Sequence, residues 1–377
     1  MKQFAITIIL VISLFNLCSV GKASNNGTSK PQVWYSDAQD KLREVVPSLS
    51  VLEDQFPEDP EILLGLATIY ARYCPTRELS RRAVQLYRKV IELDPMNKPA
   101  RIGVVQEVFE SFSYKRFWMV ESLYSQEYYA KKKNLQEVEI LDVPWEDEIN
   151  DLLCEFLREE GQEKIIVRDF NEALVRVCEK YDRKYLPVIL AELDNAERFE
   201  PGNALYNYRR AQLYFDIGNA EKGLEELEKG SRKPYFNRYL VQTAAARKRI
   251  LQKADFPDKY RHTIEKEVSR AWGLPGESFL DPAHNMNPWR VPDKPSAFKI
   301  SKQEQKSGNL KKAIDIYETA IRIAKQYDEE PIPGEAGQGP RKQSDRKKRE
   351  YLFEKIARQQ LNEIRSHLKT RDSLCHD

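Results

Sequence analysis

Small and apolar residues recur at a spacing of 34 positions in the middle of this chain. The pairs are Ile189 and Gly223, Leu193 and Leu227, and Ala196 and Gly230. Residues three or four positions apart lie on one face of an α-helix, so each set predicts an amphipathic helix. A lone helical hairpin cannot bury its apolar face, and several such units are therefore expected in one chain.

The stretch from Arg81 to Pro95 predicts another helix of this kind. Its apolar residues fall at helical spacing, and Pro95 ends the helix just after its last turn. The order of a small residue, an aromatic, a β-branched residue and a proline resembles the second helix of a tetratricopeptide repeat; these residues are Ala83, Tyr87, Val90 and Pro95. Ala83 is small because a partner helix must come close there, and Tyr87 fills the space on the facing side.

Three further segments carry features of the same repeat. The matching residues are Leu63, Leu66, Ala67 and Tyr70; Ala211, Tyr214 and Gly218; and Gly308, Ala313, Tyr317 and Ala320. The turn from Cys74 to Arg77 departs from the family and resembles a four-residue insertion. The resemblance implies an all-α fold, a helical-hairpin solenoid with irregular connectors. Unrelated α-helical hairpins are the alternative.

The first 23 residues have the pattern of a secretory signal peptide. Lys2 precedes an uncharged apolar run over residues 4–20, and Gly21 and Ala23 offer cleavage sites. We therefore expect an exported protein, either periplasmic or extracellular. The apolar run is close to the minimum length for a membrane span, so an uncleaved anchor is the alternative.

The charge balance argues against nucleic acid as a partner. Removing Lys2 and Lys22 with the signal peptide leaves 59 of the 61 basic residues against 59 acidic ones, so the mature chain carries no formal net charge. The basic run at 341–349 is expected to keep a linker solvated. Contact of that run with an anionic envelope polymer or head group is the alternative.

No catalytic or metal-binding pattern stands out in the sequence. None of the 4 histidines has a second metal-type ligand at helical spacing, and Cys154 and Cys178 lie on apolar helical faces typical of core thiols. The acidic clusters 146–148 and 159–160 consist of adjacent residues, which point in different directions on a helix. We expect no enzyme activity, no cofactor and no metal. Glycan processing by an aromatic run and an acidic pair is the enzymatic alternative.

Changes in composition divide the chain into nine segments. These are a signal peptide (1–23), a disordered linker (24–33), an N-terminal repeat block (34–133), a connector and helix (134–168), a central repeat block (169–235), a helical segment with a Pro-rich connector (236–293), a C-terminal repeat (294–328), a flexible basic linker (329–349) and a capping helix (350–371).

Within these segments, one helix is expected to break and two stretches leave alternatives open. The lead-in helix from Trp34 to Phe56 is expected to break near Pro47. The aromatic residues at 112–129 fill either the core between hairpins or a ligand platform. The run at 138–145 forms either a connector or a short strand pair.

The family resemblance implies protein binding on the concave surface formed by the first helices of successive repeats. In the clearest unit, the concave positions fall on Leu205, Tyr208, Gln212 and Phe215. Tyr208 and Phe215 would supply apolar contact and Gln212 a hydrogen bond to a partner peptide or helix. The expected function is an exported scaffold for complex assembly in the cell envelope. A permanent structural subunit of an envelope or surface complex is the alternative.

Overall fold

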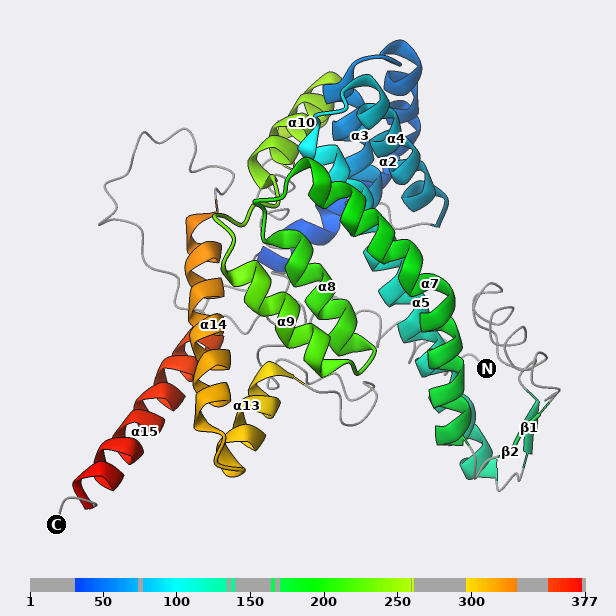
Figure 1. Cartoon of the computed structure of the whole chain (residues 1–377). Coiled ribbons are helices and arrows are strands. Elements are labelled where there is room, and N and C mark those ends of the chain that lie inside the picture. The colour runs from blue at the N-terminus through cyan, green and yellow to red at the C-terminus, as the bar shows by residue number, and fades with distance from the viewer. Residues whose placement is uncertain are drawn as a thin grey trace.

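The computed structural model describes residues 31–73, 77–133, 137–139, 164–166, 170–258, 260, 296–330 and 352–374. This part of the chain is almost entirely helical and contains one small antiparallel sheet (Figure 1). The predicted all-α class is therefore confirmed at this level. The signal peptide (1–23), most of the turn at 74–77 and most of the flexible basic linker at 329–349 lie outside the described residues. A helix continues to Glu329, inside the predicted start of that linker.

The described elements follow one another along the chain in a fixed order. They are α2 (Pro31–Gln55), α3 (Pro60–Tyr73), α4 (Arg77–Leu93), α5 (Lys98–Lys133), β1 (Glu137–Glu139), β2 (Lys164–Ile166), α7 (Phe170–Phe199), α8 (Leu205–Asp216), α9 (Ala220–Ser231), α10 (Leu240–Lys253), α13 (Ala297–Lys306), α14 (Leu310–Glu329) and α15 (Leu352–Leu374).

Helices that are neighbours in sequence are also neighbours in space. From α2 to α9, each helix packs on the next one along the chain. Helix α9 then contacts α14, which also packs against α13 and α15 (Figure 1). Contacts of this local kind are what stacked helical hairpins make, because each apolar face is covered by the adjacent unit.

Helix α10 departs from this order. It follows α9 in sequence but packs against α3, far away along the chain (Figure 1). Gly65 in α3 makes this contact close: a Cβ atom at Gly65 would lie 2.5 Å from the carbonyl oxygen of Ala246 and 2.5 Å from Ile250. The crossing therefore depends on the absence of a side chain at Gly65.

Glycines also allow aromatic rings to pack tightly between the other helices. Tyr87 of α4 lies on Gly103 of α5, and its hydroxyl is 3.4 Å from Thr68 Oγ1 in α3. A Cβ at Gly103 would overlap the ring of Tyr87. Tyr87 thus fills a space between helices, as its position in the repeat pattern predicts. Gly103 of α5 provides that space because it has no side chain.

Two turn glycines join helices that pack as hairpins. Gly218 between α8 and α9 has φ of +83°, and Gly308 between α13 and α14 has φ of +84°. Residues with a side chain rarely adopt this left-handed conformation, whereas glycine adopts it easily. The two glycines therefore end α8 and α13 and turn the chain into the next helix. Both glycines lie where the repeat pattern places a turn.

The expected break at Pro47 is not found. Helix α2 continues through Pro47, and α7 likewise contains Pro187. A proline removes one helical hydrogen bond, and packing of the rest of the helix can hold it together. Helix α2 also begins at Pro31, inside the segment predicted to be a linker, and Pro suits the first position of a helix.

A two-stranded sheet lies at the end of the long α5 and α7 pair. Strands β1 and β2 pair antiparallel, with Val138 opposite Ile165 (Figure 1). For the start of the 138–145 run, the strand alternative is therefore the correct one. Of the aromatic run at 112–129, Phe112 is buried and stacks on Tyr181 of α7 at 5.1 Å between ring centroids. Phe112 is therefore a core residue.

Candidate functional site

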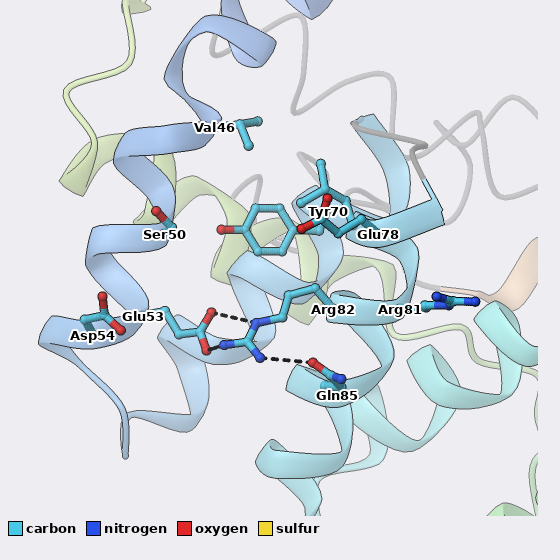
Figure 2. A pocket seen from close by; sticks show the side chains of 10 residues that line it. Val46, Ser50, Glu53, Asp54, Tyr70, Glu78, Arg81, Arg82 and Gln85 are labelled. Atoms are coloured by element: carbon cyan, nitrogen blue, oxygen red, sulfur yellow. Dashed lines mark hydrogen bonds and ion pairs between the residues drawn. The ribbon is translucent and has the colours of Figure 1, made fainter.

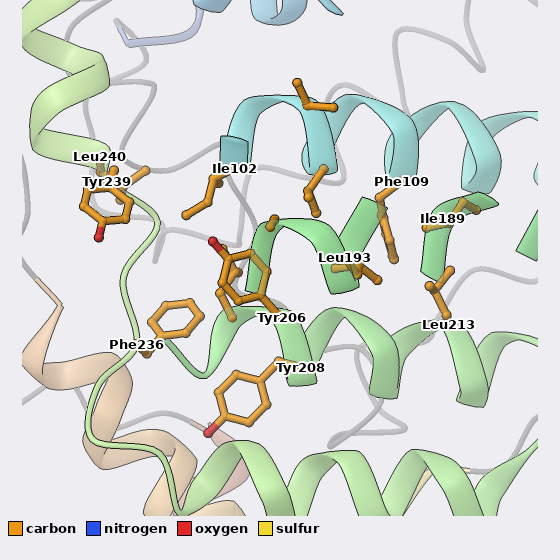
Figure 3. Packing of buried hydrophobic residues seen from close by; sticks show 14 of the residues in the cluster. Ile102, Phe109, Ile189, Leu193, Tyr206, Tyr208, Leu213, Phe236, Tyr239 and Leu240 are labelled. Carbon is orange, nitrogen blue, oxygen red and sulfur yellow. The ribbon is translucent and has the colours of Figure 1, made fainter. Parts of the chain in front are cut away.

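The predicted partner-binding residues lie on α8, and three of the four are inside the protein. Leu205, Tyr208 and Phe215 are 2%, 0% and 3% exposed, while Gln212 is half-buried. The sequence placed them on one face of α8, but this helix is covered on more than one side. In Figure 3, Leu213 points toward Leu193 of α7 and Tyr208 points the opposite way.

Tyr208 belongs to an aromatic cluster that joins α8 to α14. Its ring lies 5.9 Å from Phe236 and 5.8 Å from Tyr327, and its hydroxyl donates to the Oε1 atom of Gln326. Gly230 of α9 allows the close approach on the remaining side. Burial raises the pKa of Tyr208, so the hydroxyl stays protonated. The contacts of Tyr208 in this structure are thus within the chain.

Phe215 and Gln212 also contact residues of the same chain. The ring of Phe215 packs on Gly223 of α9, where a Cβ would be 2.9 Å from it. Gln212 accepts a hydrogen bond of 3.0 Å from Arg209, which is buried and also donates to Gln106 of α5. Burial lowers the pKa of Arg209 to about 10. A partner-binding role for these side chains stays a prediction, and the accessible grooves lie elsewhere.

A buried carboxylate fixes the segment between α9 and α10. Glu200 is 2% exposed and accepts hydrogen bonds from the hydroxyls of Tyr206 at 3.2 Å, Tyr235 at 3.0 Å and Tyr239. Lys98 Nζ lies 3.8 Å from the same carboxylate. Burial, together with the charge of Glu200, raises the pKa of Tyr235 to about 12. This network ties the end of α7 to the segment that leads into α10.

A groove of about 700 Å³ lies between α2 and α4, with α3 as its floor (Figure 2). Its apolar lining includes Val46, Tyr70 and Leu79. Its polar lining is provided by Ser50, Glu53, Asp54, Glu78, Arg81, Arg82 and Gln85. On α2 and α4 these residues recur at helical spacing, so each helix lines the groove with one continuous face.

One ion pair connects the two walls of the α2–α4 groove. Arg82 Nε lies 3.1 Å from Glu53 Oε2, its second nitrogen also contacts this carboxylate, and its third is 3.0 Å from Gln85 Oε1 (Figure 2). A fork of this kind fixes both side chains and bridges α2 to α4. The groove therefore offers a partly apolar surface with polar edges, a composition typical of protein contacts.

A second groove, of about 430 Å³, lies between α14 and α15. It is lined by Glu318, Ile321 and Arg322 of α14 and by Arg358, Leu361, Asn362 and Arg365 of α15. The sequence reasoning singled out neither groove. The helical spacing of their residues was visible, but which helices would lie on either side of a groove was not.

Within the described ranges, no group of three or more His, Cys, Asp or Glu side chains is placed to hold a metal ion. No helix of the described part is both long and apolar enough to cross a bilayer. Comparison with protein-family models, curated proteins and solved structures finds no match to this chain.

Proposed function

We propose that this chain is an exported helical-hairpin scaffold, similar to tetratricopeptide-repeat solenoids, that binds a protein partner in the cell envelope. The observation that carries the proposal is the packing order from α2 to α9, in which each helix covers the next. Arrays built in this way present extended surfaces along their length, and their common use is to hold other proteins. Binding rather than catalysis is part of the proposal, with no nucleic acid and no cofactor.

The α2–α4 groove is the binding surface that we propose for this scaffold. Its central residues come from three successive helices, and the Arg82–Glu53 pair holds its two walls at a fixed separation. An apolar side chain of a partner helix or peptide would lie between Val46 and Leu79, with polar contacts to Ser50 and Gln85. This surface replaces the face of α8 in the proposal, because most of that face is buried.

The alternative of a permanent structural subunit predicts one large apolar face outside the groove. The exposed large apolar residues of the described part are Val51, Leu93, Met96, Val175, Val188, Phe199 and Tyr235. Three of them, Met96, Phe199 and Tyr235, lie near one another: Arg101 stacks on the Phe199 ring and donates to the carbonyl of Pro95, next to Met96, and Tyr235 donates to Glu200, next to Phe199. A permanent contact of the subunit alternative would lie on this cluster.

Photocrosslinking in the native cell tests the proposal. A photoreactive residue at Ser50 should capture a distinct protein, and Arg82→Gln should weaken the capture because the groove loses its bridge. A photoreactive residue at Val175, exposed on α7, is the control and should not capture the same protein. Equal capture from both positions into one fixed complex would favour the subunit, and no capture from either would contradict the scaffold. Mass spectrometry of the chain's own N-terminus tests export and cleavage in the same sample.

A further inference from the structure

The groove between α14 and α15 carries a surplus of positive charge. Its lining includes three arginines, Arg322, Arg358 and Arg365, and one glutamate, Glu318. This differs from the α2–α4 groove, where acidic residues accompany the two arginines. A surplus of two positive charges in a partly enclosed groove attracts a negatively charged ligand, because walls of low dielectric strengthen the field inside.

Arg322 is the least compensated of the three arginines. Its Nη2 atom donates to Thr319 Oγ1 at 2.8 Å and its Nε atom to Ser231 Oγ at 3.2 Å. Both acceptors are neutral hydroxyls, whereas a guanidinium offers five N–H donors and a full charge. Within the described residues, Arg322 has no carboxylate partner, so it can still bind one.

The two arginines of α15 are held to different degrees. Arg365 Nη2 lies 3.5 Å from Glu318 Oε1, at the long limit of a hydrogen bond, and the side chain of Arg365 is 59% exposed. Exposed pairs of this kind contribute only about 0–1 kcal/mol, so a ligand carboxylate can compete for Arg365. Arg358 is held more firmly, because its Nε and Nη2 atoms donate at 2.8 Å and 2.6 Å to Oε1 of Glu354, whose side chain is 12% exposed. A ligand carboxylate would therefore join this pair at the exposed side of Arg358 without displacing Glu354.

The spacing of these groups restricts the shape of the ligand. Arg358 and Arg365 are seven residues apart, which is about 10 Å along a helix at roughly 1.5 Å per residue. Leu361, which is 4% exposed, and Asn362 lie between them, and Ile321 faces them from α14. A ligand that fits has two carboxylates about two helical turns apart with an aliphatic side chain between them.

These features distinguish a protein ligand from other polyanions. A nucleic acid or a charged membrane presents negative charge continuously and would place some of it against Glu318 and the apolar floor. An amphipathic acidic helix instead presents its aliphatic residue to Ile321, the half-buried apolar residue of the lining, and its carboxylates to the arginines. Charge and apolar surface thus alternate in the ligand as they do in the groove.

We propose that the α14–α15 groove binds an amphipathic acidic helix of a partner protein, through carboxylates at Arg322, Arg358 and Arg365 and an aliphatic side chain against Ile321. The proposal rests on the proposed scaffold function and specifies a partner surface separate from the α2–α4 groove. Because the arginines are partly exposed, binding should depend strongly on salt concentration.

The test uses the full chain and a fluorescent 18-residue helical peptide that carries two glutamates seven residues apart with a leucine between them. We expect it to bind at least tenfold more tightly than the same peptide with glutamines. The triple variant Arg322→Gln, Arg358→Gln, Arg365→Gln should lose at least tenfold in affinity for the acidic peptide. The control is Arg232→Gln, just after the end of α9, whose side chain is 71% exposed and pairs with Glu228 of α9; it should bind as the unchanged protein does.

A charge swap keeps the test independent of folding defects. The variant Arg365→Glu should bind the acidic peptide more weakly. It should instead bind a peptide in which the second glutamate is replaced by lysine. Equal affinity of the triple variant and the control would overturn the proposal. Arginine-dependent binding to vesicles with one third anionic lipid, without peptide binding, would overturn it in favour of a membrane contact. Capture of a partner at Ser50 together with failure of the peptide would contradict this inference alone and leave the scaffold function intact.

Discussion

The buried ion pair between Arg238 and Glu330 should hold the C-terminal helices onto the rest of the protein. The two side chains are 5% and 2% exposed and come from the segment before α10 and the end of α14. Arg238 donates from Nε at 2.9 Å and from Nη2 at 2.7 Å to Glu330 Oε2, and its backbone N–H donates to Oε1 at 2.7 Å. Glu330 therefore holds both the side chain and the main chain of Arg238 in place.

We expect Glu330→Gln to destabilise the protein by about 3–5 kcal/mol, the usual loss when one partner of a buried ion pair is removed. The change keeps the shape of the side chain but removes the buried carboxylate that Arg238 contacts. Replacing both residues, as Arg238→Met with Glu330→Leu, should cost much less, because the ion pair is then removed as a whole. The loss thus comes from removing one buried charge of a pair and not from lost volume.

Urea unfolding followed by circular dichroism measures both variants, and hydrogen exchange locates the change. Glu330→Gln should increase amide exchange in α14 and in the segment before α10, while α3 and α4 change little. Arg232→Gln, in an exposed pair at the C-terminal end of α9, is the matched control and should stay within about 0.5 kcal/mol of the unchanged protein. A loss below about 1 kcal/mol for Glu330→Gln, or a double variant as unstable as the single one, would refute the reasoning.

Three further predictions concern the joints between helices. Gly65→Ala should lower stability by about 1–3 kcal/mol through overpacking, since the new Cβ meets the main chain of Ala246. Gly223→Ala should cost less, because its Cβ meets the ring of Phe215 and not a main chain. An equal loss of stability in thermal unfolding for both variants would contradict this explanation. Asp182→Asn should cost about 3 kcal/mol in urea unfolding because Arg116, 9% exposed, loses the counter-charge that joins α5 to α7; an unchanged midpoint would refute it. Burial opposes ionisation of Glu197, but Lys233 and Arg210 outweigh it and lower its pKa below 4.5, so this stabilisation is complete above pH 4.5 and is lost as the pH falls below it. Glu197→Gln should flatten the loss of stability in acid, and an identical pH profile would exclude this role.

The sequence by itself determined where the helices lie and which of their faces are apolar. Ala83, Leu193, Leu227 and Ala313 are all buried, as their helical spacing predicts. Helix formation depends on residues a few positions apart, and the turn at Gly218 depends on the conformation of one residue. These local properties can be predicted because the interactions that produce them are contained in short segments.

Only the tertiary structure decided which helix covers which face. Helical spacing placed Tyr208 on an apolar face of α8 but did not show that Phe236 and Tyr327 would bury it. Nor did it show that α10 would pack on α3 at Gly65, or that arginines of α14 and α15 would line one groove. Burial of apolar surface is non-directional, so any apolar face of suitable shape can cover another. The choice among them depends on close packing between segments far apart in the sequence, and that packing exists only in the folded chain.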